Sequence, residues 1–325
     1  MEFIRYEIHE NDADRRIDRI LRRFLPGLPL SAVYRLIRKG GVRLNGARVQ
    51  PGTLCPAGSV LEIDRRQAGM HTKDSRPDAA PPENPDSRTA EAEKRFAGRI
   101  LLKTKDLFFL NKPAGIAVHG ADSLCTYIPH YMQAESLSFR SGALHRLDKN
   151  TTGILAFSRT LEGARWFSRN IQEKTIGKFY AGILESRGKN LTEGTWLDAP
   201  PAAAANRQNP GGAAKGMETD VIPVAASRNR ILALFRIHTG RKHQIRRQAS
   251  ARGFPLAGDT RYGGSPQEGG YFLHAVRMVF PEQRPEGLPE VLSAPFPVRF
   301  IREADRLFGK NILADLFCTP YTENR

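Results

Sequence analysis

The stretch that decides the fold is Leu144-His145-Arg146-Leu147-Asp148-Lys149-Asn150-Thr151-Thr152-Gly153, which runs directly into the apolar residues 154–157. A glycine ahead of a short apolar run is typical of a turn that leads into a buried strand. Asp148 is the only acid in this stretch, and polar and basic side chains surround it. We therefore expect Asp148 to lie at the mouth of a sheet, where a catalytic group can meet its substrate.

The chain from about residue 99 onward predicts a mixed α/β unit. Short or alternating apolar segments predict strands at 107–110, 154–157, 178–184, 231–238 and 271–280, of which 178–184 is expected to be half buried. Thr160 is expected to cap a helix that ends near Lys174. Strands outnumber helices, and several follow one another without a crossover helix. This pattern favours an α+β fold with a mixed, largely antiparallel sheet.

Residues 1–66 predict a small α/β module of their own. Apolar residues at helical spacing predict one buried helix face, made of Ile17, Ile20, Leu21 and Phe24. Ser31 is expected to cap a second helix that ends at Gly40. The exposed side of this second helix carries Arg35, Arg38 and Lys39. Asn45-Gly46 between two apolar segments then predicts a tight hairpin.

The predicted domain organisation has four parts. Residues 1–66 form the first module, and residues 67–98, which are rich in proline and poor in apolar side chains, form a flexible linker. The linker is expected to let the module move. The catalytic unit spans residues 99–305 and contains an inserted loop at 202–216. Residues 306–325 form a tail without an assigned role.

Charge is the main compositional signal. Lys and Arg number 50 against 34 Asp and Glu, a net charge of +16, which favours a polyanionic partner such as nucleic acid or an anionic membrane surface. No apolar run reaches the roughly 20 residues that span a bilayer, and we expect no membrane association. Cys55, Cys125 and Cys318 are widely separated. They form neither a disulfide framework nor a metal-binding pair, so we expect a reducing cytoplasm.

A basic cluster follows the strand predicted at 231–238. Residues 236–252 hold six Lys or Arg and no acid. Arg241 and Lys242, together with the backbone amides at the start of the helix that follows, suit contacts with phosphate groups. Neither a phosphate-binding loop, nor a dinucleotide fingerprint, nor a zinc motif occurs in the sequence. We therefore expect no cofactor and no metal.

Lys178 and Tyr180 form a third pattern, because alternate residues of a strand point to the same face. Tyr180 has two interpretations at this point. It is either an ordinary aromatic residue of the core or a ring that stacks on an extruded base.

Residues 144–153 resemble the signature of the RluA-type RNA pseudouridine synthases, in which His-Arg-Leu-Asp precedes two variable residues, Thr or Ser, Ser or Thr, and Gly. Residues 239–246 and the Lys-x-Tyr pattern at 178–180 are similar to further motifs of that family, and residues 1–66 resemble an S4 RNA-binding domain. The resemblance implies that Asp148 is the catalytic aspartate and Tyr180 the active-site tyrosine. It also implies that Arg246 pairs with Asp148 and that Arg146 fills the space left by a flipped uridine.

The function that we expect is conversion of uridine to pseudouridine, in the branch of the family that modifies large-subunit ribosomal RNA, by a monomer that binds RNA. A carboxylate beside C1′ can act as a nucleophile or as a base, and the sequence does not choose between them. Two alternatives stay open: a non-catalytic RNA-binding or ribosome-assembly protein, and a metal-free hydrolase that uses Asp148. Of these three functions, only the conversion of uridine to pseudouridine releases the hydrogen from C5 of uridine.

Overall fold

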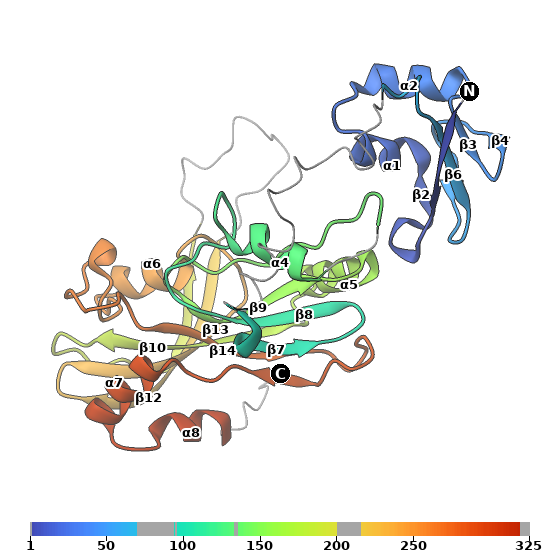
Figure 1. Cartoon of the computed structure of the whole chain (residues 1–325). Helices are drawn as coiled ribbons and strands as arrows, with labels where there is room; N and C mark the ends of the chain where they lie inside the picture. Colours follow the sequence, from blue (N-terminus) through green and yellow to red (C-terminus); the bar gives the residue numbers. More distant parts are fainter. Residues whose placement is uncertain (1, 70–93, 95, 133–135, 200–215, 319–325) are drawn as a thin grey trace.

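The computed structural model describes residues 2–69, 94, 96–132, 136–199 and 216–318. Most of the predicted linker, and the predicted loop at 202–216 apart from residue 216, lie outside these residues. A small N-terminal unit lies beside a larger unit that is built on a long sheet (Figure 1). Within the described ranges, no helix is both long enough and apolar enough to cross a membrane.

The N-terminal unit is a four-stranded antiparallel sheet covered by two helices. In sheet order its strands are β1 (Phe3–Glu7), β6 (Val60–Asp64), β3 (Val42–Leu44) and β4 (Ala47–Arg48). The helices are α1 (Ile17–Phe24) and α2 (Leu30–Arg38). A short helix η1 (Glu10–Asp12) and a two-stranded ribbon of β2 (Arg15–Arg16) and β5 (Leu54–Cys55) complete the unit.

Both predicted helices and the predicted hairpin of this unit are confirmed. The apolar face of α1 is buried in the core of the unit, and α2 is followed by Gly40 with φ +72°. Asn45 and Gly46 both have positive φ, as a tight hairpin turn requires. The predicted cap at Ser31 is wrong, because α2 begins at Leu30 after Pro29. Ser31 therefore lies inside the first turn, and the Pro29 carbonyl accepts the first amide bonds of the helix.

The larger unit is a nine-stranded sheet whose neighbouring strands are antiparallel, except for the parallel pair β9 and β14. This arrangement confirms the predicted mixed, largely antiparallel α+β fold. In sheet order the strands are β11 (Gly194–Asp198), β12 (Met217–Ser227), β13 (Arg230–Ile237), β10 (Gly177–Glu185), β14 (Leu273–Val279), β9 (Thr152–Ser158), β8 (Leu107–Lys112) and β7 (Ile100–Lys103), with β15 (Val291–Ser293) paired to β14.

Helices cover both faces of this sheet. Helices α4 (Leu124–Met132) and α6 (Gln244–Ala251) share one apolar cluster with the sheet, whereas α7 (Val298–Phe308) and α8 (Ile312–Cys318) pack on another. Helix α5 (Leu161–Gln172) packs on a third cluster, and the short helices η2 (Ala97–Arg99) and η4 (Thr260–Tyr262) lie in loops. The predicted cap of α5 is confirmed, because Thr160 accepts a hydrogen bond from the Gly163 amide at 3.0 Å.

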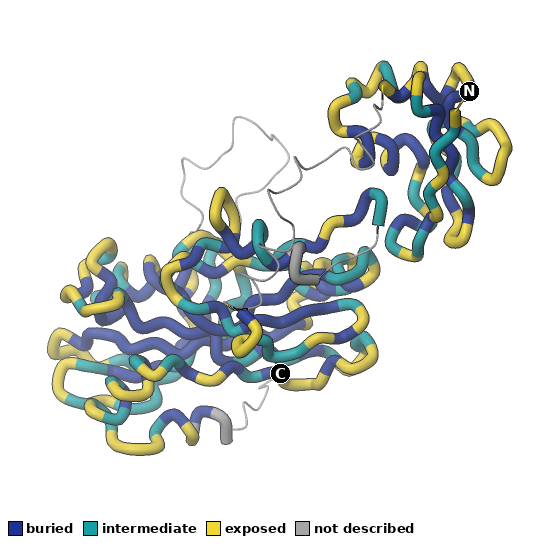
Figure 2. The backbone as a smooth tube through the Cα atoms, in the orientation of Figure 1, coloured by how far each residue is buried: buried dark blue, intermediate teal, exposed yellow. Residues whose placement is uncertain are grey.

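Strand β10 differs from its predicted half-buried state. All nine of its residues are buried, and the centre of the sheet is dark blue along its length in Figure 2. The cause is that Tyr180 faces the cluster shared with α6 while Phe179 faces the cluster shared with α7. Two predicted domain boundaries, near residues 98 and 305, also fall within packed parts of the structure. Phe96, inside the predicted linker, belongs to the first of these clusters, and residue 305 lies within α7.

Gly153 explains why a glycine follows the Asp148 segment. It has φ +107°, and a Cβ atom on it would lie 2.2 Å from the carbonyl oxygen of Ala275, its parallel partner on β14. A side chain at position 153 would therefore force apart the two strands at whose ends the site is built.

We expect Gly153→Ala to lower the free energy of unfolding by about 2–4 kcal/mol, because backbone strain and a steric clash add together. The matched control is Gly120→Ala, since Gly120 has φ +112° but nothing within 4 Å of the added Cβ. Chemical denaturation of both variants measures the difference. Equal losses of stability in the two variants would contradict the close approach at Ala275.

Candidate active site

A buried lysine holds the backbone of the loop that carries Asp148. Lys112, at the end of β8, is fully buried and donates hydrogen bonds of 2.8 Å to the carbonyls of Pro113 and Lys149. Burial lowers the pKa of Lys112 to about 7, although the charge of Asp148 opposes this effect. The Gly115 amide also donates to the Lys149 carbonyl. These bonds fix the backbone at Lys149, directly after Asp148.

Arg246 lies between two carboxylates. Its Nε and Nη2 atoms donate to both oxygens of Asp259 at 2.7 and 2.8 Å, while Nη1 lies 3.4 Å from Oδ2 of Asp148. Burial disfavours the charge of Arg246, but the hydrogen bonds that it donates to Asp259 and the nearby negative groups outweigh burial and raise its pKa. Arg246 is therefore a permanent cation, anchored by Asp259 and presented to Asp148.

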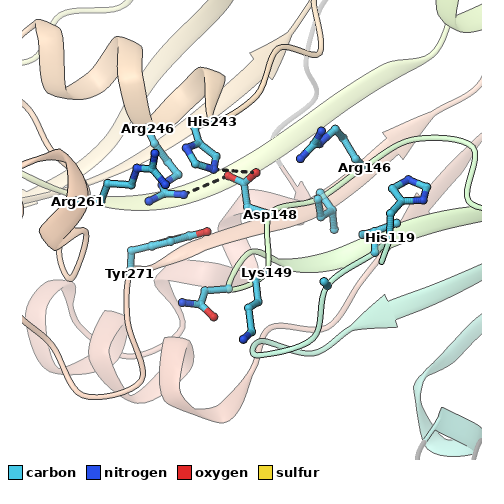
Figure 3. Close-up of a pocket in the computed structure, with 12 residues that line it drawn as sticks. His119, Arg146, Asp148, Lys149, His243, Arg246, Arg261 and Tyr271 are labelled. Carbon is cyan, nitrogen blue, oxygen red and sulfur yellow. Dashed lines mark hydrogen bonds and ion pairs between the residues drawn. The ribbon is translucent and has the colours of Figure 1, made fainter. Parts of the chain in front are cut away.

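Aromatic rings and a histidine complete the surroundings of Arg246. The guanidinium carbon lies 4.4 Å from the ring centre of Tyr271 and 4.9 Å from that of Tyr262. His243 Nδ1 lies 2.8 Å from the Tyr262 hydroxyl, and its Nε2 lies 3.6 Å from Asp148 Oδ1. Burial lowers the pKa of His243, and the charges of Arg246, Arg261 and Lys242 act in the same direction, whereas the charge of Asp148 opposes them. Figure 3 shows Arg246 and His243 converging on the Asp148 carboxylate from the same side.

Two adjoining cavities meet at Asp148. The smaller, of about 390 Å³, is drawn in Figure 3, and its wall includes Asp148, Arg246, Arg261 and Tyr271. The larger, of about 500 Å³, extends toward β10 and α5. Such volumes fall within the range of about 300–1,000 Å³ that is typical of small-ligand sites. The Asp148 side chain is 14% exposed, so a group bound in either cavity can reach it.

Lys178 and Tyr180 both line the larger cavity, together with Asp148. Tyr180 is buried, and its pKa is raised by burial and by the nearby Asp148 charge, so its hydroxyl stays protonated. Burial also lowers the pKa of Lys178 to about 8. The strand thus offers a hydroxyl donor and an amine donor to the same cavity as the carboxylate.

The cations near the site that were predicted to contact RNA are all exposed, but not all of them border the larger cavity. Arg146, Arg241 and Lys242 are exposed, and the first two border the larger cavity. The backbone amide of Arg241 does not face outward for a phosphate, because it donates to Gln244 Oε1 at 3.1 Å and so shapes the turn ahead of α6.

Some of the six cations of residues 236–252 have acidic partners, which the sequence of that segment does not indicate. Arg246 pairs with Asp259, and Arg252 pairs with Asp198 at 3.2 Å. In both pairs the acid lies outside the basic segment, so the sequence of that segment alone could not reveal it.

The histidines in and around the site have hydrogen-bonding partners. His145 Nε2 lies 3.0 Å from the Ala156 amide, His274 Nδ1 lies 2.8 Å from Thr152 Oγ1, and His238 Nε2 lies 2.6 Å from Asp220. Among the residues that the structure describes, no group of three or more His, Cys, Asp or Glu has the arrangement of a metal site.

Comparison with known proteins identifies the family. The family model described as RNA pseudouridylate synthase matches residues 106–251, and the S4 domain model matches residues 15–61. A protein of Vibrio cholerae named ribosomal large subunit pseudouridine synthase C is 34% identical over 267 residues, which are 79% of each chain. The chain belongs to the RNA pseudouridine synthase family. The resemblance inferred from its motifs is therefore confirmed.

Further relatives agree with this synthase assignment. An Escherichia coli protein of the same name is 28% identical over 90% of this chain and 92% of its own. The solved structure of human RNA pseudouridylate synthase domain containing 4 has a TM-score of 0.55 and 22% identity, and it covers 68% of this chain and 97% of its own. That likeness shows that the synthase has the family's fold.

The sequence predicted no role for several residues of the synthase site. Asp259, Tyr262 and Tyr271 surround Arg246 but come from segments well beyond the basic cluster. Asp259 and Tyr262 lie in residues 253–263, which also follow a pattern of the family, but that pattern indicated no role for either residue. Lys112 likewise lies in a stretch that resembles the family, and its burial under the Asp148 loop was not predicted.

Proposed function

We propose that this synthase acts on specific uridines of large-subunit ribosomal RNA, with Asp148 as the catalytic carboxylate, Tyr180 as the active-site hydroxyl and Arg246 as the cation that keeps Asp148 ionised. The observation that carries these roles is the position of Asp148 between Arg246 and a cavity of about 500 Å³ that Tyr180 also lines. An adjacent cation favours the charged form of a carboxylate. Either role of Asp148, nucleophile or base, requires that form.

The reaction is an isomerisation, so the product has the same composition as the uridine. The N1–C1′ bond breaks, a C5–C1′ bond forms, the hydrogen on C5 leaves as a proton, and N1 ends protonated. A stacked or paired uridine hides these atoms, so the base leaves its stack to enter the cavity. We infer that Arg146, exposed at the cavity rim, takes the place of the base in the RNA. Tyr180 lines the same cavity as Asp148, so its hydroxyl would take part in moving the proton at C5 of a base bound there.

The proposed target follows from relatives whose names specify the ribosomal large subunit. We infer a cytoplasmic site of action, because ribosomal RNA is found there. Asp148, Tyr180, Arg246 and Asp259 all belong to one chain, so a monomer contains every group that the proposal needs. In the proposed domain organisation the linker lies within residues 67–98, ahead of the packed Phe96, and residues 306–325 form a C-terminal segment whose helix α8 packs on the larger unit.

Release of tritium from RNA that carries the label at C5 of uridine tests the activity. Ribosomal RNA from cells lacking this protein supplies the substrate, and mapping of pseudouridine with and without the protein names the positions. Release from this RNA is the expected result. Modification of transfer RNA alone would contradict the ribosomal target, and absence of release from any RNA would favour a non-catalytic binding protein or a hydrolase.

We also propose that the exposed face of α2, formed by Arg35, Arg38 and Lys39, contacts RNA phosphates along with Arg241 and Lys242. Replacing the three α2 cations by Gln should lower the log–log salt slope of RNA binding by about 2–3, because each phosphate contact contributes about 0.9. The control is Arg228→Gln, Arg302→Gln and Lys310→Gln, which removes equal charge from exposed positions outside the site. Equal slopes for the two triple variants would contradict this role of α2.

A further inference from the structure

The short helix η1 joins the two units of the molecule through a buried carboxylate. Asp12, in the N-terminal unit, is fully buried. It accepts hydrogen bonds from the Leu137 amide at 2.7 Å, the Ser138 amide at 2.9 Å and the Ser136 hydroxyl at 2.9 Å, and also from the Ser138 hydroxyl. These donors all belong to the segment of the larger unit that leads to the Asp148 loop. A carboxylate held in this way anchors one unit to the other.

The other two residues of η1 also contact the larger unit. The Asn11 side chain accepts from the Leu161 amide at 3.1 Å and so caps the first turn of α5. Glu10 lies 3.4 Å from Lys105 in an exposed ion pair. In return, Leu137 packs against the apolar core of the N-terminal unit. We call residues 10–12 with their partners 136–138 the η1 latch.

The latch explains why the N-terminal unit lies against the larger unit, an arrangement that the sequence did not predict. A flexible linker alone predicts no contact between the units, whereas in the structure the N-terminal unit contacts the larger unit through the latch (Figure 1). Docking takes the Asp12 carboxylate out of water, and the donors of residues 136–138 replace its hydration. Hydrogen bonds to an ionised acceptor are among the stronger ones, and several of them on one carboxylate favour the docked arrangement.

Docking also brings like charges of the two units together. Arg15 donates a hydrogen bond to Ser138 Oγ at 2.6 Å. Burial lowers the pKa of Arg15, and although the Asp12 charge opposes this effect, three nearby cations lower the pKa further: Arg23, Arg165 and Arg19. Arg19 and Arg23 lie one helical turn apart on α1. Arg165 lies on α5 of the larger unit, one turn after the Leu161 amide that Asn11 of the N-terminal unit caps. All three are exposed, and in the described part of the chain no carboxylate bonds to any of them. We call Arg19, Arg23 and Arg165 the junction arginines.

We propose that the η1 latch locks the N-terminal unit onto the catalytic unit, and that the junction arginines form one surface that binds the phosphodiester backbone of the RNA beside the target uridine. The proposal rests on the proposed function, since the bound polyanion is the RNA substrate. Fixed cations of like sign repel one another until an anion lies between them. Guanidinium groups bind phosphate oxygens through paired hydrogen bonds, which suits them to a backbone rather than to a base.

The latch is tested in the full chain by Asp12→Asn, with Asp14→Asn as its control. Asp14 is exposed, and asparagine tolerates its left-handed φ of 54°. Amide exchange at Leu137 and Ser138 should be at least about tenfold faster in Asp12→Asn, because these amides lose their charged acceptor. Unchanged protection would overturn the latch. Ser138→Ala weakens the same contact from the other unit, and the same result is expected if Asp12→Asn folds poorly.

The junction surface is tested by RNA binding with Arg23→Gln, Arg165→Gln and the double variant. Each single change should lower the log–log salt slope by about 1 in the wild-type background. In the Asp12→Asn background the two changes should lose their coupling, because the units no longer hold the arginines together. An unchanged slope in Arg165→Gln, or equal coupling in both backgrounds, would overturn the surface.

Turnover separates this proposal from the proposed function. We expect Asp12→Asn to raise KM for RNA by about fivefold or more while kcat changes less than about twofold, since the latch contributes to binding and not to chemistry. Normal latch protection without tritium release would contradict the proposed function alone. Tritium release with normal KM in Asp12→Asn would contradict the latch alone.

Discussion

Asp148→Ala is expected to lower turnover by at least roughly 10³-fold, as removal of a group that takes part in bond making commonly does. The RNA affinity should change little, because the proposed phosphate contacts come from arginines and lysines elsewhere. The fold should also survive, since Arg246 keeps its two hydrogen bonds to Asp259 when Asp148 is removed. The loss should therefore lie in kcat rather than in KM or in stability.

Single-turnover tritium release at saturating RNA measures this effect directly, with a filter-binding assay for affinity. The matched control is Asp198→Ala, which also removes a carboxylate paired with an arginine, but one that lies outside both cavities. The control should retain near wild-type turnover. Activity of Asp148→Ala within about tenfold of the wild type would reject Asp148 as the catalytic carboxylate.

Much of the fold could be predicted because local patterns determine it. The spacing of Ile17, Ile20, Leu21 and Phe24 predicts α1, and Thr160 marks the start of α5. The burial of β10 could not be predicted in the same way. Its two faces are covered by α6 and α7, which lie far along the chain, and alternation within one strand carries no information about distant partners.

The candidate site likewise has residues that local motifs predict and residues that only the packing of distant segments brings together. Asp148, Tyr180 and Arg246 lie in recognisable motifs, and the structure brings them to one cavity wall. No role was predicted for Asp259, although it is the closer partner of Arg246 at 2.7 Å, against 3.4 Å for Asp148. A pairing between residues on different segments depends on how those segments pack. The η1 latch is unpredictable for this reason too, since Asp12 and Ser138 meet only in the folded chain.

Arg246→Met is expected to reduce both turnover and stability, because Arg246 serves two carboxylates. Asp259 is 1% exposed, and losing its partner leaves a buried charge that costs about 3–5 kcal/mol. Asp148 would also lose the cation that favours its ionised form, so turnover should fall by about 10²-fold or more. Urea denaturation and single-turnover kinetics measure the two losses separately.

The double variant Arg246→Met with Asp259→Asn separates the two roles. It removes the buried negative charge along with its partner, so most of the lost stability should return. Turnover should stay low, because Asp148 still lacks its cation. Asp259→Asn alone is the control, since it keeps the arginine beside Asp148 but weakens its anchor, and it should lose less activity than Arg246→Met. If turnover recovered along with stability in the double variant, Arg246 would act only as a structural partner of Asp259.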